Sequence, residues 1–183
     1  VIDDHVANWS LELSPESHDE QIRGVQDEKV FYKNSEMEAV IREALRLRCH
    51  RIDVFFMIGL SQQTRASVLG SIDYCEKLFQ TSDARLSCFI SPMGPFVDPG
   101  SRCFEEPERY GYSLFARTLE EHRQLLVQPS WEQILNYETR WMSREELVDV
   151  TYDAAEVLNS LKLKYGRIES GRGQEVAERI NRA

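Results

Sequence analysis

The chain has 183 residues, of which 42% are hydrophobic and 29% charged, a balance typical of a globular protein with a core. Its formal net charge of −9 argues against a nucleic-acid partner, because phosphate backbones attract local excesses of Lys and Arg. No apolar run approaches the roughly 20 residues that cross a bilayer, and the first residues lack the regions of a signal peptide. We therefore expect a cytoplasmic protein with no membrane partner.

The first predicted elements are a strand and a helix. Residues 9–13 alternate apolar and polar side chains, which is typical of a strand. Residues 17–33 are polar and predict a loop or a short helix. Ser35 and Glu38 have the spacing of a capping box, so a helix is predicted from about residue 35 to residue 48.

Two further strands and a second helix follow. Residues 52–60 are nearly all apolar, as in a strand buried on both faces of a parallel sheet. A helix is predicted over 65–79, where Thr64 is placed to cap it, and a third strand over 86–90. Cys75 and Cys88 fall on apolar positions of this helix and strand, and we expect both to be buried as small hydrophobic residues.

The C-terminal part is predicted to be helical. Residues 106–128 predict a helix in their second part, and residues 130–142 are rich in aromatic side chains. Ser143 and Glu146 form a second capping-box pattern, and the helix that follows is predicted to close near Gly166. The sequence then turns polar and predicts a frayed end. The predicted organisation is a strand–helix unit over 1–105, a helical extension over 106–170 and a polar tail over 171–183.

Strands that alternate with helices predict an α/β fold with about three parallel strands, flanking helices and a helical C-terminal tail. Ligands of such folds bind at the carboxyl ends of the strands. Glu16 follows the first predicted strand, and its carboxylate is of a kind that accepts hydrogen bonds from a ribose diol or an ammonium group. From its position alone, an exposed loop residue or a helix-capping group is the favoured interpretation of Glu16, and a cap explains Asp19.

Gly59 ends the second predicted strand, where a missing side chain admits a flat ligand or simply terminates the strand. His18, beside Glu16 and Asp19, raises the alternative of a metal site, which we do not favour because adjacent loop residues rarely all point inward. The aromatic segment 130–142 is consistent with a cover over a planar cofactor, but packing against the sheet is the simpler interpretation.

The three stretches LELSPESHDEQIR, IDVFFMIGLSQQT and FISPMGPFVDPGS resemble, in this order, the fourth, fifth and sixth strands of the radical S-adenosylmethionine (SAM) barrel. The resemblance covers about residues 9–101 and is strongest to members that carry a cobalamin-binding domain; the segment 110–168 is similar to the C-terminal extension of one such subgroup. It implies a partial (β/α) barrel in which Glu16 and Ser17 contact the ribose or amino group of SAM. Ile58 and Gly59 would approach the adenine through backbone atoms.

In the same resemblance, Pro92 and Met93 line the adenine pocket. The sequence departs from the family in four respects. Ser61 stands where a Pro is usual, and Arg48 stands where a Gly is often found. The cluster-binding Cys-x-x-x-Cys-x-x-Cys motif and the cobalamin-type Asp-x-His-x-x-Gly motif are both absent. The four cysteines lie too far apart to replace the cluster-binding motif. We therefore expect neither catalytic residues nor metal ligands in this chain, which alone should be inactive and hold no cofactor.

The expected function is that of a C-terminal fragment of a radical SAM iron–sulfur enzyme. Its parent would use SAM and a [4Fe–4S] cluster, with cobalamin as a candidate third cofactor, to modify an unknown substrate. The expected partner is the missing N-terminal half of the barrel, and the open sheet edge also allows a dimer. A non-enzymatic α/β module that binds a nucleotide or another protein is the alternative, and a small hydrolase ranks last because no nucleophile and base are evident.

Overall fold

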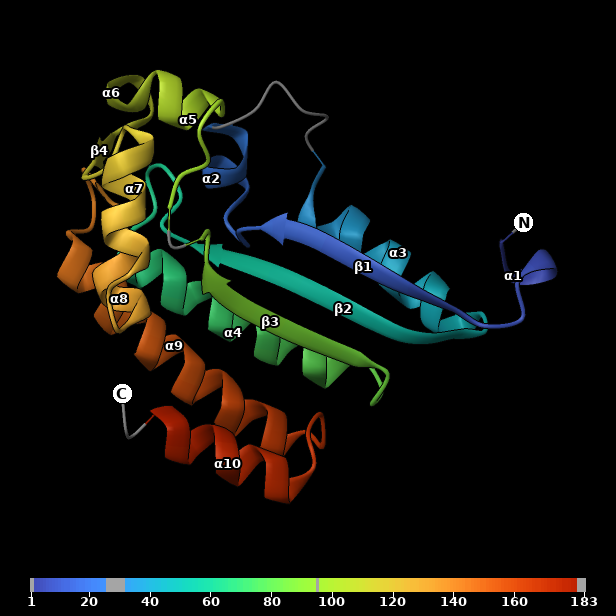
Figure 1. Cartoon of the computed structure of the whole chain (residues 1–183). Coiled ribbons are helices and arrows are strands. Elements are labelled where there is room, and N and C mark those ends of the chain that lie inside the picture. The colour runs from blue at the N-terminus through green and yellow to red at the C-terminus, as the bar shows by residue number, and fades with distance from the viewer. Residues whose placement is uncertain (1, 26–31, 95, 181–183) are drawn as a thin grey trace.

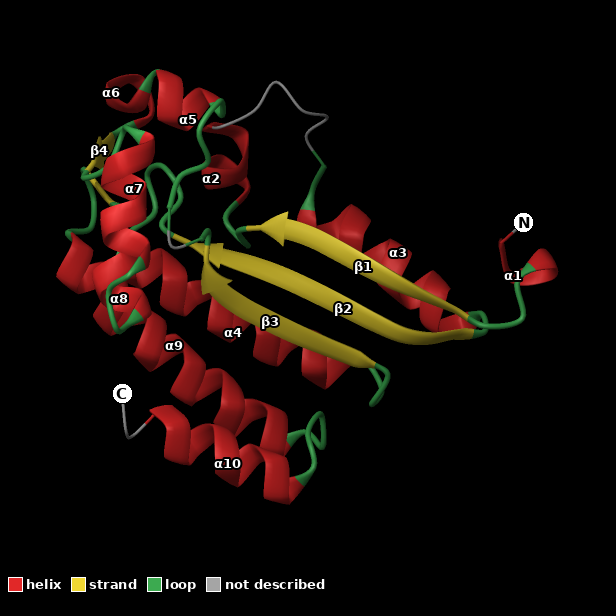
Figure 2. Ribbon diagram, viewed as in Figure 1, coloured by secondary structure: helices red, strands yellow, loops and turns green. Residues whose placement is uncertain are grey.

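The computed structural model describes residues 2–25, 32–94 and 96–180 and shows an α/β protein (Figures 1 and 2). Parts of the predicted loop at 17–33, position 95 of the turn after the third strand, and positions 181–183 lie outside the described residues. The chain begins with a short helix, α1 (Ile2–His5), which precedes the first strand.

The central feature is a parallel sheet with the strand order β1-β2-β3. Its strands are β1 (Trp9–Glu16), β2 (Cys49–Ile58) and β3 (Leu86–Pro92). Val54, in the middle strand, lies opposite Leu13 on one side and Cys88 on the other. The sequence predicts all three strands, and each extends two or three residues beyond the predicted range at one of its ends.

Two crossover helices cover one face of this sheet, as Figure 2 shows. They are α3 (Asn34–Arg46), between β1 and β2, and α4 (Arg65–Thr81), between β2 and β3. The side chains of β2 that point toward these helices are fully buried: Ile52, Val54, Phe56 and Ile58. Cys75 and Cys88 are buried in the same core, as predicted.

The helix starts follow the capping rules with one correction. Thr64 caps α4 by accepting a hydrogen bond from the Ser67 amide, as predicted. The predicted capping box of Ser35 and Glu38 is wrong. The helix α3 begins one residue earlier, and the carboxylate that accepts from the cap backbone is that of Glu36, at 2.7 Å from the amide of Lys33. Glu38 instead accepts a 2.8 Å hydrogen bond from Tyr74 of α4, and this bond ties the two crossover helices together.

Short elements lie beyond the carboxyl ends of the strands (Figure 1). They are α2 (Glu20–Val25), α5 (Arg102–Glu105), α6 (Pro107–Tyr110), β4 (Tyr112–Leu114), α7 (Leu119–Leu126), α8 (Trp131–Ile134) and β5 (Tyr137–Thr139). The strands β4 and β5 pair antiparallel. The sequence predicts neither, because three residues are too few to show a strand period.

Two helices complete the chain: α9 (Arg144–Lys164) and α10 (Ser170–Ile180). Ser143 accepts from the Glu146 amide at 3.2 Å, which confirms the predicted capping box. The expectation of a frayed polar end is corrected over α10, which packs against α9. Asn159 of α9 donates a 2.9 Å hydrogen bond to the carbonyl of Gly173, and the side chain of Leu163 fills the space that a Cβ on Gly173 would need.

The second face of the sheet carries side chains that the described helices leave partly exposed. Ser10, Glu12 and Ser14 on β1 are exposed, and Phe55 of β2 stacks on Phe89 of β3 with ring centroids 5.0 Å apart. Parallel sheets usually have both faces covered. This open face therefore lacks the cover that is usual for a parallel sheet.

Candidate functional site

The end of β1 places Glu16 in an unusual backbone conformation. Its φ is +65°, a left-handed value that costs about 1–2 kcal/mol in residues other than glycine. The pairing with β2 is irregular between Leu13 and Glu16, and the amide of Ser17 turns back to the carbonyl of Pro15 at 2.7 Å. Among the described residues, no hydrogen bond or ion pair engages the Glu16 carboxylate. Strained backbone and a free carboxylate together favour a functional interpretation of this position.

The residues after Glu16 are engaged locally. Ser17 is fully buried, and its hydroxyl accepts from the amide of Asp19 at 3.1 Å. The Asp19 carboxylate accepts from the Gln21 amide at 2.8 Å, at the start of α2, which confirms that it acts as a helix cap. Ser17 therefore supports the turn and presents no free side chain.

His18 turns away from Glu16 and packs on α4. Its Nδ1 lies 3.0 Å from the Ser71 hydroxyl, and its ring occupies the space beside Gly70. Burial lowers the pKa of His18, although the carboxylates of Asp19 and Asp73 oppose this effect. Among the residues that the structure describes, no group of His, Cys, Asp and Glu side chains could hold a metal ion.

The end of β2 is held by a buried glutamine. Gln63 accepts hydrogen bonds from the amides of Gly59 at 2.8 Å and Leu60 at 3.2 Å, and it donates to the carbonyl of Met57 at 2.9 Å. Ser61, where a proline is usual in the family that the sequence resembles, donates to the carbonyl of Tyr110 at 2.7 Å. Side-chain hydrogen bonds thus fix the loop after β2.

Gly59 has a φ of +92° and is covered by a tyrosine ring from β5. A Cβ at Gly59 would lie 2.6 Å from the Tyr137 hydroxyl and 3.0 Å from its ring. Burial raises the pKa of Tyr137, and the Met93 amide partly opposes that rise. The close approach that the sequence predicts at Gly59 is therefore made by the protein itself, and the hydroxyl of Tyr112 also donates to the Gly59 carbonyl, at 3.0 Å.

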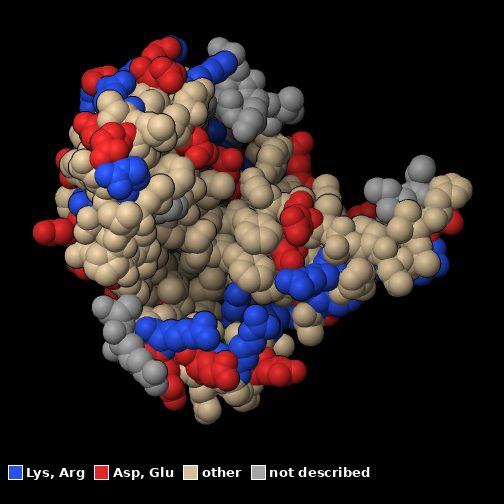
Figure 3. All heavy atoms as spheres, viewed as in Figure 1, with Lys and Arg blue, Asp and Glu red and all other residues tan. Residues whose placement is uncertain are grey.

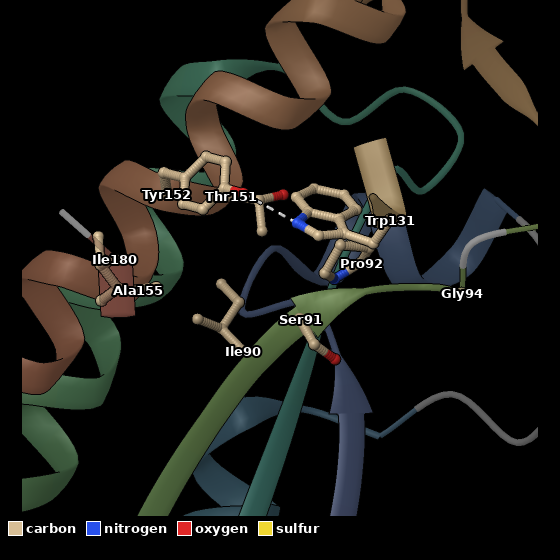
Figure 4. Close-up of a pocket in the computed structure, with 9 residues that line it drawn as sticks. All are labelled: Ile90, Ser91, Pro92, Gly94, Trp131, Thr151, Tyr152, Ala155 and Ile180. Carbon is tan, nitrogen blue, oxygen red and sulfur yellow. Dashed lines mark hydrogen bonds between the residues drawn. The ribbon is translucent and has the colours of Figure 1, made fainter. Parts of the chain in front are cut away.

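The end of β3 meets the end of β2 and opens into a cavity. The amide of Met93 donates to the carbonyl of Ile58 at 2.9 Å, so the predicted residues of these two strands lie side by side. Pro92 and Trp131 line an adjoining pocket of about 410 Å³, the rim pocket (Figure 4). Its other lining residues are Ile90, Ser91, Gly94, Thr151, Tyr152, Ala155 and Ile180.

An aromatic pair forms one wall of the rim pocket. The indole of Trp131 donates a 3.0 Å hydrogen bond to the Tyr152 hydroxyl, which in turn donates to Glu132. Figure 4 shows the Trp131 ring beside Pro92, at the end of β3. The arrangement fixes both polar tips and leaves apolar surface toward the cavity, which suits a flat, mostly apolar group.

The structure therefore brings the predicted residues to one edge of the sheet, but it leaves only some of their groups free to contact a ligand. Glu16 has a free carboxylate, and Pro92 faces a cavity. Ile58 and Met93 contribute a backbone hydrogen bond, whereas Ser17 and Gly59 are covered by the protein's own groups. The sequence analysis missed Gln63, Tyr137 and Tyr152. Only Gln63 had a local signal, its place in the loop that directly follows a buried strand.

Comparisons with known proteins assign no family to this chain. No described helix is long and apolar enough to cross a membrane. A scan against protein-family models finds no match to the chain, and neither do searches of curated proteins and of solved structures.

Proposed function

We propose that this chain is the C-terminal part of a radical SAM enzyme and contributes the SAM-binding side of its barrel. The observation that carries the proposal is the convergence of three parallel strand ends, with Glu16, Ile58 and Pro92 at one edge of an incompletely covered sheet. In a closed (β/α) barrel, the open face of this sheet would point inward. Closure would take strands from another part of the protein, paired to the outer edge of β1.

Two of the predicted contacts fit SAM as the side chains stand. The carboxylate of Glu16 is free to accept hydrogen bonds from a ribose hydroxyl or an ammonium group. Pro92, beside Trp131, offers an apolar wall to a flat ring. These two residues end the outer strands of a three-stranded sheet, so their backbones lie roughly 10 Å apart by strand spacing. A ligand of nucleoside size is long enough to reach both residues.

The remaining contacts fit through the backbone or act indirectly. Ile58 and Met93 are held together by a backbone hydrogen bond, which fixes the floor between Glu16 and Pro92. Ser17 and Gln63 orient the loops around this floor. When bound, a reduced [4Fe–4S] cluster supplies the electron for reductive cleavage of SAM. We propose that the cluster, and cobalamin if it is used, are held by residues outside this chain.

The test uses the protein encoded by the whole reading frame, purified without oxygen. We expect a Cys-x-x-x-Cys-x-x-Cys motif before Val1, stoichiometric iron, a reducible cluster signal and formation of 5′-deoxyadenosine from SAM. Glu16→Gln should lower SAM affinity about tenfold or more, because it removes a charge-assisted acceptor. Glu12→Gln is the matched control, because it makes the same change on the same strand, about 13 Å away. A protein without iron, or equal effects of both variants, would refute the proposal.

A nucleotide-binding or interaction module without catalysis is the second candidate, and the rim pocket favours it. The cavity of about 410 Å³ has an aromatic wall and lies at a strand end, where α/β proteins bind ligands. Under this alternative, the protein from the whole reading frame binds an adenine nucleotide but forms no 5′-deoxyadenosine. The same experiment therefore separates the two functions.

A further inference from the structure

A second cavity lies near the amino ends of the strands, at the opposite end of the sheet from Glu16 and Pro92. It has a volume of about 530 Å³ and is bounded by β2, β3, the end of α9 and the start of α10. We call it the basic pocket. Its charged lining residues, apart from a histidine at its edge, are Arg51, Asp53, Arg85, Lys162, Arg167 and Arg172.

The charge of this pocket is opposite to that of the protein. Five of the named side chains are cationic and one is a carboxylate, whereas the whole chain has a formal net charge of −9. Figure 3 shows Lys and Arg side chains gathered along α10 and the adjacent end of the sheet. Cations that lie close together repel one another, and a bound anion would offset this repulsion.

Two of the five cations already have carboxylate partners. Arg51 lies 2.7 Å from Asp53, and Arg85 lies 2.7 Å from Asp83. Within the described part of the chain, Lys162 and Arg172 have no ion pair and no hydrogen bond. The ammonium of Lys162 instead lies 4.0 Å from the centre of the Phe89 ring.

Burial makes the unpaired state of Lys162 costly. Loss of water around the ammonium lowers its pKa, although the acidic groups of Cys88, Cys75 and Asp53 oppose this. A charge held away from water without a hydrogen-bonded counter-ion is unfavourable. An anion in the pocket would remove that cost.

Two of the lining residues also carry a buried polar atom that lacks a hydrogen bond. Among the described residues, Oδ1 of Asp53 and Nε of Arg167 are buried without a partner. The Arg167 guanidinium is fixed in place, because its Nη2 donates to the carbonyls of Phe79 at 2.8 Å and Ser82 at 2.9 Å. One orphaned acceptor and one orphaned donor therefore belong to residues that line a cationic cavity, and each is unfavourable as long as it has no partner.

We propose that the basic pocket binds a small hydroxylated phosphate ester, whose phosphate is held by Lys162, Arg167 and Arg172 and whose hydroxyl donates to Asp53. Phosphate oxygens accept several hydrogen bonds at once, which suits an ammonium and two guanidinium groups around one cavity. A hydroxyl on the same molecule would satisfy the free oxygen of Asp53. The proposal is independent of SAM binding, because the two sites lie at opposite ends of the strands.

The test is calorimetric titration of the protein encoded by the whole reading frame with ribose 5-phosphate, inorganic phosphate and ribose. We expect ribose 5-phosphate to bind best, inorganic phosphate more weakly and ribose undetectably, with affinities that fall as NaCl is raised. Arg172→Gln should weaken ribose 5-phosphate binding about tenfold or more. Arg179→Gln is the matched control, because it removes the same charge from the exposed end of the same helix, away from the pocket.

A further variant separates recognition of the hydroxyl from attraction of the phosphate. Asp53→Asn should reduce the advantage of ribose 5-phosphate over inorganic phosphate, and circular dichroism checks that it remains folded. No phosphate binding at 10 mM ligand (a concentration about ten times a millimolar Kd) would overturn the proposal. Equal losses in the Arg172 and Arg179 variants, or binding of ribose as tight as that of its phosphate, would do so as well.

Discussion

Gly59→Ala is the substitution whose cost the structure specifies most closely. Gly59 has a φ of +92°, and a Cβ there would lie 2.6 Å from the hydroxyl of Tyr137. The left-handed backbone costs a residue with a Cβ about 1–2 kcal/mol. Overpacking against a buried ring adds about 1–3 kcal/mol, because Tyr137 is only 1% exposed and has no free space to enter.

The expected loss in the free energy of unfolding is therefore about 2–5 kcal/mol, measured by urea denaturation. Gly100→Ala is the matched control. Gly100 has a similar φ of +87°, but a Cβ there would meet no atom within 4 Å. It should show the backbone cost alone, about 1–2 kcal/mol, and the difference between the two variants gives the cost of the clash with Tyr137.

A double-mutant cycle tests the contact directly. Tyr137→Phe removes the nearest atom of the clash but leaves the ring carbon that a Cβ would approach to 3.0 Å. Gly59→Ala should thus cost less in the Tyr137→Phe background, by about 1 kcal/mol. Equal costs of Gly59→Ala and Gly100→Ala, or full additivity in the cycle, would refute the packing of Tyr137 on Gly59.

Two further outcomes follow from the loops around the same edge. Gln63→Leu should lower the free energy of unfolding by about 3 kcal/mol or more, because three backbone groups lose their partner. Gln62→Leu, on the exposed neighbour, should change the free energy of unfolding by less than about 0.5 kcal/mol in the same urea titrations. Burial lowers the pKa of His18 in the folded state. The contribution of His18 to stability is therefore complete above the ordinary pKa of 6.5. It is lost as the pH falls from that value toward the folded-state pKa. His18→Gln should flatten this decline between pH 7 and pH 5, and the exposed control His50→Gln should retain it; an unchanged decline in His18→Gln would contradict the burial of a neutral imidazole.

Local patterns predicted the sheet because its strands are encoded locally. The apolar segment 52–60 and the cap at Thr64 define β2 and α4 without any knowledge of neighbouring elements. The same approach missed α10, whose polar composition conceals the close helix contact that Gly173 permits. Contacts between distant segments leave no local pattern, which is why the tyrosine over Gly59 could not be predicted.

The candidate site shows the same division. Glu16 could be selected from its place after a strand, but its left-handed backbone and free carboxylate depend on the irregular pairing of β1 with β2. The basic pocket was invisible to sequence reasoning, because its cations come from β2, the turn before β3, the end of α9, the segment before α10 and α10 itself. The net charge of −9 had argued only against a nucleic-acid partner.

The outer edge of β1 also affects how the protein behaves at high concentration. Among the described strands, β1 pairs only with β2, so its other edge offers backbone donors and acceptors to any strand that meets it. Pro15 limits this template near its carboxyl end, since a proline supplies no amide hydrogen to a ladder. Self-association through this edge would therefore involve residues 9–14, and a lysine introduced at the exposed Ser10 or Ser14 offers a way to suppress aggregation without disturbing the core.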